Sequence, residues 1–274
     1  MVKYACLLSA FCFIMSNSLS ITIIVRNITR DSFSESSRNA LNSDYLMQEW
    51  DYRRSTGPLL QTCNIFNAFG WLFFTFPVFE LTWILSHGGK RKVGLHASII
   101  AFTITSCFSE VISRLIILGA WGSTHWISTK FNLSYWLPNG SEDRVGWKSL
   151  EVIWIITESL VNWIDAFEWI CLSFVLVLLY FSISALSKEK RVLPLWWAKL
   201  GLFIAFFAFI DFTADLVNLE NYEAFARISI MCIILNTLIL LPSWLIFLSC
   251  HFHDAFSQSI GATSETIQFE LPVI

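Results

Sequence analysis

The chain has 274 residues, of which 55% are hydrophobic and only 14% are charged. A soluble domain carries about 25% charged residues, so this chain has too little polar surface to coat a globule in water. The formal net charge of -3 gives no strong field that would attract nucleic acid, and we expect no nucleic-acid partner. The composition instead predicts an all-α, polytopic transmembrane helix bundle in a lipid bilayer.

Residues 1–25 have the pattern of a signal peptide or of a signal anchor. Lys3 precedes an apolar run, and small residues suited to cleavage follow at 16–18. Residues 19–25 restore hydrophobicity, so the whole run is also long enough to form a sixth span. Cleavage is favoured, because the glycosylation sequon at Asn27 would lie too close to the bilayer behind an uncleaved anchor.

The rest of the chain divides into three parts, which are an extracytoplasmic polar segment at 26–58, a five-helix transmembrane domain at 59–250 and a cytoplasmic tail at 251–274. Loose coil with at most one short helix is expected in the polar segment. Five apolar runs in the domain are each long enough to cross a hydrocarbon core of ~30 Å as a helix. They are 59–85, 93–121, a part of 149–186, 195–219 and 226–250.

The third of these runs is too long for a simple crossing. Its most apolar part is 169–186. Since a hydrocarbon core of ~30 Å takes only about 20 helical residues, we expect residues 151–162 to continue the helix beyond the membrane.

The segments between the spans assign the two sides of the membrane. The connections at 86–92 and 187–191 are short and basic, which places them in the cytoplasm. The connection at 122–148 carries sequons at Asn132 and Asn139, which are glycosylated only on the lumenal side. We therefore expect the N-terminal segment outside and the C-terminus in the cytoplasm, in the plasma membrane or a secretory-pathway endomembrane.

Several spans carry ionisable side chains, each of which costs about 2.5–3.5 kcal/mol to insert and so needs a partner or water. With the sides assigned as above, most of these residues fall in the outer half of the bundle, whereas the inner half is almost entirely apolar, with Glu80 as the main exception. The candidate ligand- or ion-binding residues are Glu110, Arg114, Asp165, Glu168, Asp211, Asp215 and Arg227.

Five of these candidates are acids and two are arginines, so the group has an acidic excess that would attract a cation or an amine. The apolar inner half argues against a standing pore, because a channel would need a hydrophobic constriction that opens. We expect a transporter, channel or receptor-like component for a cation or small amine. The same residues also fit interhelical salt bridges in a non-catalytic structural or accessory subunit with a membrane protein partner.

Catalytic motifs are absent from the sequence: it has no GxSxG, no GxGD and no Walker loop. His87, His96, His251 and His253 fall at the cytoplasmic ends of spans and could hold a metal ion, as in a membrane hydrolase. They lack HExxH spacing, so we predict no metal, no cofactor and no enzymatic activity. All seven cysteines lie in apolar runs and fit packing groups better than disulfides.

Overall fold

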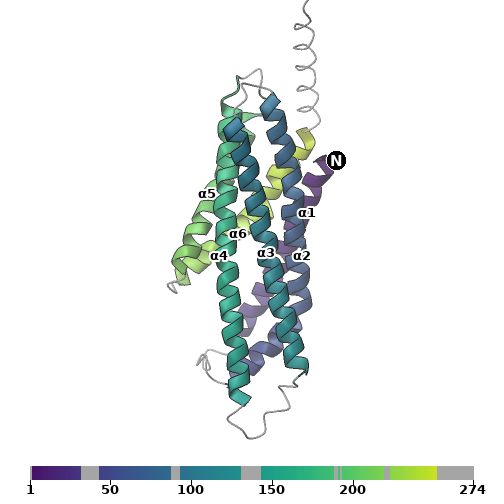
Figure 1. Cartoon of the computed structure of the whole chain (residues 1–274), viewed down its shortest axis with the longest axis vertical. Coiled ribbons are helices and arrows are strands. Elements are labelled where there is room, and N and C mark those ends of the chain that lie inside the picture. Colours follow the sequence, from purple (N-terminus) through teal and green to yellow (C-terminus); the bar gives the residue numbers. More distant parts are fainter. Residues whose placement is uncertain are drawn as a thin grey trace, which may run out of the picture.

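The computed structural model describes residues 2–31, 43–87, 93–130, 143–187, 191, 193–218 and 223–251. These residues form an all-α bundle, which confirms the predicted fold class (Figure 1). The helices are α1 (Val2–Asp31), α2 (Ser43–His87), α3 (Val93–Lys130), α4 (Asp143–Ser184), α5 (Leu195–Asn218) and α6 (Glu223–Ile234), and α6 runs on through the π-helix η2 (Leu235–Leu240) into helical residues 241–251.

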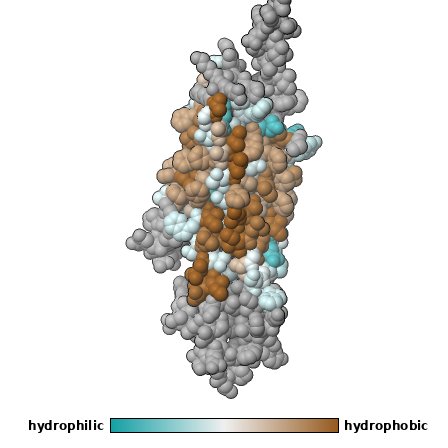
Figure 2. Space-filling view, in the orientation of Figure 1, coloured by the Kyte–Doolittle hydropathy of each residue, from teal (hydrophilic) through white to brown (hydrophobic). Residues whose placement is uncertain are grey.

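Six helical segments in the described part of the chain are long and apolar enough to cross a membrane. They are Val2–Ile23, Ser55–Ser86, Val93–Ser123, Glu151–Ser184, Leu195–Ala214 and Ile230–His251. Large apolar side chains such as Phe108 and Phe206 are exposed on them, and Figure 2 shows apolar residues covering the middle of the face in view. The chain is therefore a multi-pass integral membrane protein, in which each helix satisfies its own backbone hydrogen bonds.

Helix α1 packs along α2 as its antiparallel neighbour. The Ser9 hydroxyl donates to the Gly70 carbonyl at 2.7 Å, and the Phe13 ring packs edge-on against Trp71 with 5.7 Å between ring centroids. A Cβ at Gly70 would lie 3.0 Å from the Phe13 ring, so glycine allows this close approach. Residues of α1 thus belong to the buried core, as a sixth span requires, and the cleavage that the sequence favours at 16–18 would remove part of that core.

The polar segment 26–58 is more helical than expected. Helix α2 begins at Ser43, so Gly57 and Pro58 lie inside it rather than at its start. The cause is packing against α3: the indole ring of Trp121 lies directly over Gly57, and its Nε1 donates to the Arg53 carbonyl at 3.3 Å. Because tertiary packing supplies most of the stability of a helix in a protein, this contact overrides the polar local sequence.

Helix α4 has 42 residues and is about 63 Å long at 1.5 Å per residue, twice the thickness of a hydrocarbon core. The Ser173 hydroxyl donates to the Ala205 carbonyl of α5 at 3.0 Å, which aligns the two antiparallel helices. If residues are counted along both helices from this bond, the end of α5 at Asn218 lies level with about residue 160 of α4. Helix α4 continues past that point (Figure 1). The predicted helical continuation at 151–162 is confirmed, and its place beyond the membrane stays a prediction.

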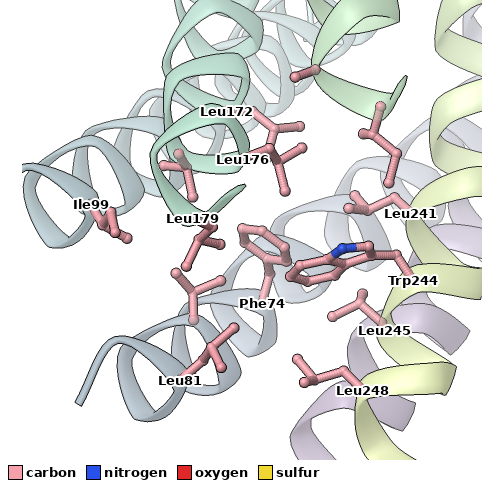
Figure 3. Close-up of a cluster of buried hydrophobic side chains, with 14 of the residues drawn as sticks. Phe74, Leu81, Ile99, Leu172, Leu176, Leu179, Leu241, Trp244, Leu245 and Leu248 are labelled. Carbon is pink, nitrogen blue, oxygen red and sulfur yellow. The ribbon is translucent and has the colours of Figure 1, made fainter. Parts of the chain in front are cut away.

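The two ends of the bundle differ in chemistry. We call them the α2–α3 end, where α2 stops at His87, and the α3–α4 end, where α3 stops at Lys130. An apolar cluster fills the half nearer the α2–α3 end, and Figure 3 shows Phe74 and Trp244 at its centre. The rings of Trp197 and Trp244 stack there at 4.3 Å. The polar side chains described next occupy the half nearer the α3–α4 end.

Candidate functional site

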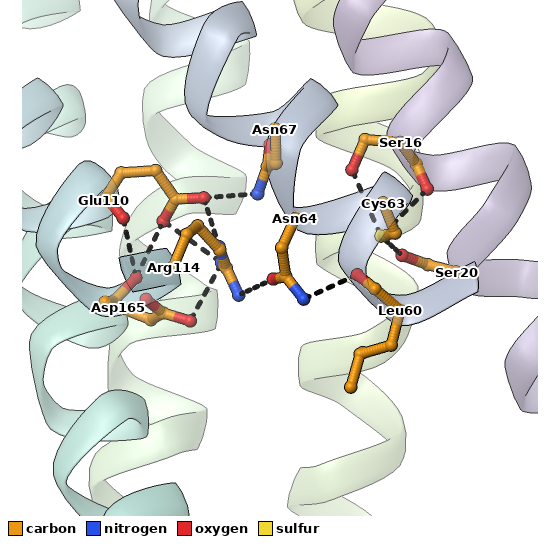
Figure 4. Close-up of polar contacts among 10 residues, drawn as sticks. Ser16, Ser20, Leu60, Cys63, Asn64, Asn67, Glu110, Arg114 and Asp165 are labelled. Carbon is orange, nitrogen blue, oxygen red and sulfur yellow. Dashed lines mark hydrogen bonds and ion pairs between the residues drawn. The ribbon is translucent and has the colours of Figure 1, made fainter. Parts of the chain in front are cut away.

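Three of the seven candidate residues form one ion-paired group between α3 and α4 (Figure 4). Glu110 and Arg114 lie one turn apart on α3, and Arg114 Nε is 2.5 Å from Glu110 Oε1. Arg114 Nη2 lies 3.1 Å from Glu110 Oε2 and 3.0 Å from Asp165 Oδ2 on α4. The guanidinium therefore bridges two carboxylates from different helices, as the interhelical salt-bridge interpretation requires.

Two asparagines of α2 complete this group. Asn67 donates to Glu110 Oε1, and Asn64 Oδ1 accepts from Arg114 Nη1 at 3.4 Å (Figure 4). Neither asparagine was among the candidate residues. The available signal was two amides three residues apart in an apolar run, a spacing that puts both on one face of a helix.

Glu168 is the most deeply placed acid of α4 and is only 2% exposed. Its carboxyl group lies within hydrogen-bonding reach of Glu110, while its Oε2 has no hydrogen-bond partner among the described residues. Glu110, Asp165 and Glu168 each offer an oxygen within 4.8 Å of the others. Carboxylates this close repel one another unless a proton or a cation lies among them.

The group opens onto a cavity of about 510 Å³ enclosed by α1, α2, α3, α4, α6 and η2. Burial deepens along its α4 wall: Glu158 and Asn162 are exposed, the Asp165 side chain is 19% exposed and Glu168 is buried. Polar side chains on successive turns of α4 therefore extend from the surface near the α3–α4 end to the buried Glu168. This gradient gives a charged ligand a route into the cavity.

Helix α1 supplies a wall of the cavity that the sequence interpretation missed. Ser16, Asn17 and Ser20 line it, and the hydroxyl of Ser20 lies 2.9 Å from Cys63 Sγ of α2 (Figure 4). The available signal was the recurrence of small polar residues within an otherwise apolar run. A cleaved leader would be absent from the mature protein. Because the sequence favours cleavage, it gives no reason to place these residues in a site.

The other candidate residues are not part of this group. Asp211 is buried on α5 and does not line the cavity, but it lies close enough to Cys232 of α6 for an electrostatic interaction. Asp215 and Arg227 lie on α5 and α6, and their side chains are outside what the structure describes. The glycosylation candidates Asn132 and Asn139 also lie outside the described residues, as does the side chain of Asn27.

The histidines have separate surroundings. His96 Nε2 is 3.2 Å from the Ser182 hydroxyl of α4, and His96 borders a second cavity of about 350 Å³ that Glu80 also lines. His251 stacks on Phe247 of its own helix at 4.0 Å. The side chains of His87 and His253 lie outside the described residues. Within the described ranges, the one group of three or more potential metal ligands is Glu110, Asp165 and Glu168.

Fold and site together define a multi-pass helical membrane protein with a buried cluster of charges beside a cavity. Comparisons of the chain with protein-family models, with curated proteins and with solved structures found no match.

Proposed function

We propose that this protein binds a cation at Glu168 and acts as a receptor-like or transport component of its membrane. The observation that carries the proposal is the buried Glu168 carboxyl group, whose Oε2 has no hydrogen-bond partner among the described residues. Its two acidic neighbours, Glu110 and Asp165, already share Arg114. A bound cation would offset the remaining negative charge, and in a medium of low dielectric that interaction is strong.

The apolar half of the bundle favours binding over a standing pore. Beyond Glu168 towards the α2–α3 end, the interior is filled by the cluster around Phe74, Leu172 and Trp244. An ion could pass only if this cluster opened, as in a hydrophobic gate. A pocket that is closed on one side fits a receptor, or a transporter that exposes its site to the two sides in turn.

Ligand-dependent thermal unfolding of the purified protein in lipid nanodiscs tests the proposal. Sodium, calcium and phenethylammonium chloride are added separately at fixed ionic strength. At least one cation should raise the unfolding midpoint saturably, because binding to the folded state alone stabilises it by ~2.7 kcal/mol at 100 times Kd. Glu168→Gln should abolish the rise, and Glu80→Gln, in the second cavity, should retain it. A panel in which no cation gives a saturable rise overturns the proposal.

A second candidate, an accessory subunit of a membrane complex, is favoured by a different observation. The part of α4 that extends past the end of α5 exposes large apolar side chains. They are Val152, Ile153, Ile155, Ile156 and Leu160. If this part of α4 lies beyond the membrane, as the sequence predicts, an exposed apolar face on it is typical of a protein contact. Purification in mild detergent should then yield one stoichiometric partner, and an Ile153→Asp/Ile156→Asp variant should lose it. Isolation of the wild-type protein alone contradicts this candidate.

A further inference from the structure

We infer that the cation held at Glu168 is an organic amine with an apolar body about the size of an aromatic ring, and not a bare metal ion. This inference rests on the proposed function and names its ligand class. Four features of the cavity support this inference. They are the position of Arg114, the cavity volume, the two tryptophans and the isoleucines that line part of the cavity.

Arg114 already occupies the place that a shared metal ion would take. Its Nη2 lies within 3.1 Å of Glu110 and 3.0 Å of Asp165, so an ion among the three carboxylates would be in contact with a guanidinium. Like charges at such a distance repel strongly in a medium of low dielectric. Glu168 Oε2 is a buried carboxylate oxygen without a hydrogen-bond partner among the described residues. A single carboxylate oxygen suits an N–H donor of an ammonium group better than a calcium ion, which takes six to eight oxygen ligands.

The volume of the cavity also fits an organic molecule. At about 510 Å³ it falls within the range of roughly 300–1,000 Å³ that is usual for sites of organic ligands. A metal ion at Glu168 would fill a small fraction of this space and leave the rest to water, against walls that are partly apolar. An amine with an apolar body fills both the charged end and the apolar remainder.

Two tryptophans line the same cavity as Glu168. Trp169 follows Glu168 on α4, Trp71 comes from α2, and both line the cavity. Their ring centroids are 6.3 Å apart and the ring planes are inclined by 77°. Aromatic faces attract ammonium groups through cation–π interactions, most strongly for tryptophan. The cavity therefore offers an amine both a buried carboxylate and aromatic rings.

Part of the cavity wall is apolar. Ile230, Ile233 and Ile234 line it from α6, and Ile117 contributes from α3. These isoleucines carry no charge that could pair with a second polar end of the ligand. Burying an apolar body against them is favourable in proportion to the area removed from water. A small amine without such a body would make no use of these contacts, so affinity should rise with the size of the apolar group.

Isothermal titration of the protein in nanodiscs, with empty nanodiscs as the blank, tests this ligand class. The probes are phenethylamine, methylamine, the uncharged 2-phenylethanol and calcium chloride. We expect phenethylamine to bind with a Kd at least tenfold below that of methylamine, and 2-phenylethanol to give no saturable heat. Saturable calcium binding without amine binding overturns the amine inference and leaves the cation proposal standing. Absence of binding by every cationic probe overturns both.

Variants separate the two ends of the ligand. Glu168→Gln should weaken phenethylamine binding at least tenfold, and Ile233→Ala should weaken phenethylamine while leaving methylamine unchanged. Glu80→Gln is the matched control, since Glu80 lines the other cavity. If Glu168→Gln fails to fold, Glu168→Asp serves instead, because it keeps the charge and shortens the reach to the ligand. Unchanged phenethylamine affinity in a folded Glu168 variant overturns the inference.

Discussion

Arg114 is the residue on which the charge balance of the cluster depends. It is the cation between Glu110 and Asp165, and the Glu110 side chain is fully buried. Removing one member of a buried ion pair is costly because it leaves the other charge without compensation, whereas removing both members costs much less. The cluster therefore behaves as a unit, and the effects of substitutions within it should not add.

We predict that Arg114→Gln lowers the free energy of unfolding by ~3–5 kcal/mol, the usual cost of breaking a buried pair. The double variant Glu110→Gln/Arg114→Gln should recover part of this loss, because it removes the unpaired charge together with its partner. Equilibrium unfolding in mixed micelles, arranged as a double-mutant cycle, measures the coupling. Additive effects of the two substitutions would show that the pair makes no net contribution.

The sequence predicted part of the cluster for a clear physical reason. Glu110 and Arg114 are one helical turn apart, so their pairing needs only that the run be a helix. The contact of Arg114 with Asp165 depends on α3 packing against α4, which no spacing along the chain specifies. The unpartnered oxygen of Glu168 depends on three-dimensional packing alone, and no spacing in the sequence reveals it.

At the scale of the helices, the contact between α2 and α3 at Gly57 leads to a prediction about stability. Gly57→Ala should lower the unfolding free energy by roughly 1–3 kcal/mol, a usual cost of overpacking, because its Cβ would overlap the Trp121 ring. Gly122→Ala, one residue from Trp121, is the matched control, since a Cβ there meets nothing within 4 Å. Thermal unfolding of both variants checks this. Equal stability of the two variants would contradict the packing described.

Helix α1 gives a prediction about processing. Its Ser9, Phe13 and Ser16 are buried against α2, so cleavage after residues 16–18 would remove a wall of the cavity and expose core side chains. We predict that intact-mass spectrometry of the purified, deglycosylated protein finds residues 1–25 present. We also expect Asn27 to be unmodified, because it would lie too close to the bilayer behind a retained helix. A mass that begins near residue 18 would contradict this prediction.

The sequence predicted the number and positions of the apolar runs better than the ends of the helices. A span is set by about 20 consecutive apolar residues, which is a local property. Helix α2 continues through Gly57 and Pro58 where Trp121 packs over Gly57, a contact between residues 64 positions apart. Long-range contacts of this kind leave no trace in the local pattern, so the polar segment looked like coil.

At the scale of the whole molecule, polarity is layered along the bundle axis. The ion-paired cluster and its asparagines occupy the half nearer the α3–α4 end, and an apolar cluster fills most of the other half, where Glu80 and His96 border the second cavity. The sequence predicted this separation into a polar half and an apolar half. Whether the cavity faces away from the cytoplasm depends on which end is outside, and the basic connections and the sequons are the signals that bear on it.

The orientation leads to the last prediction. Asn132 and Asn139 lie in the connection between α3 and α4, so both should carry glycans if the α3–α4 end faces the lumen. Endoglycosidase should shift the wild-type protein on a gel, each of Ser134→Ala and Ser141→Ala should lose one glycan, and the double variant should not shift. Ser123→Ala in α3, outside both sequons, is the control. If the wild type carries no glycan and the 122–148 connection is labelled only from the cytoplasm, the orientation of the bundle in the membrane is the reverse of the one predicted. The route along α4 to Glu168 would then open to the cytoplasm, and an extracellular amine could not reach its carboxylate.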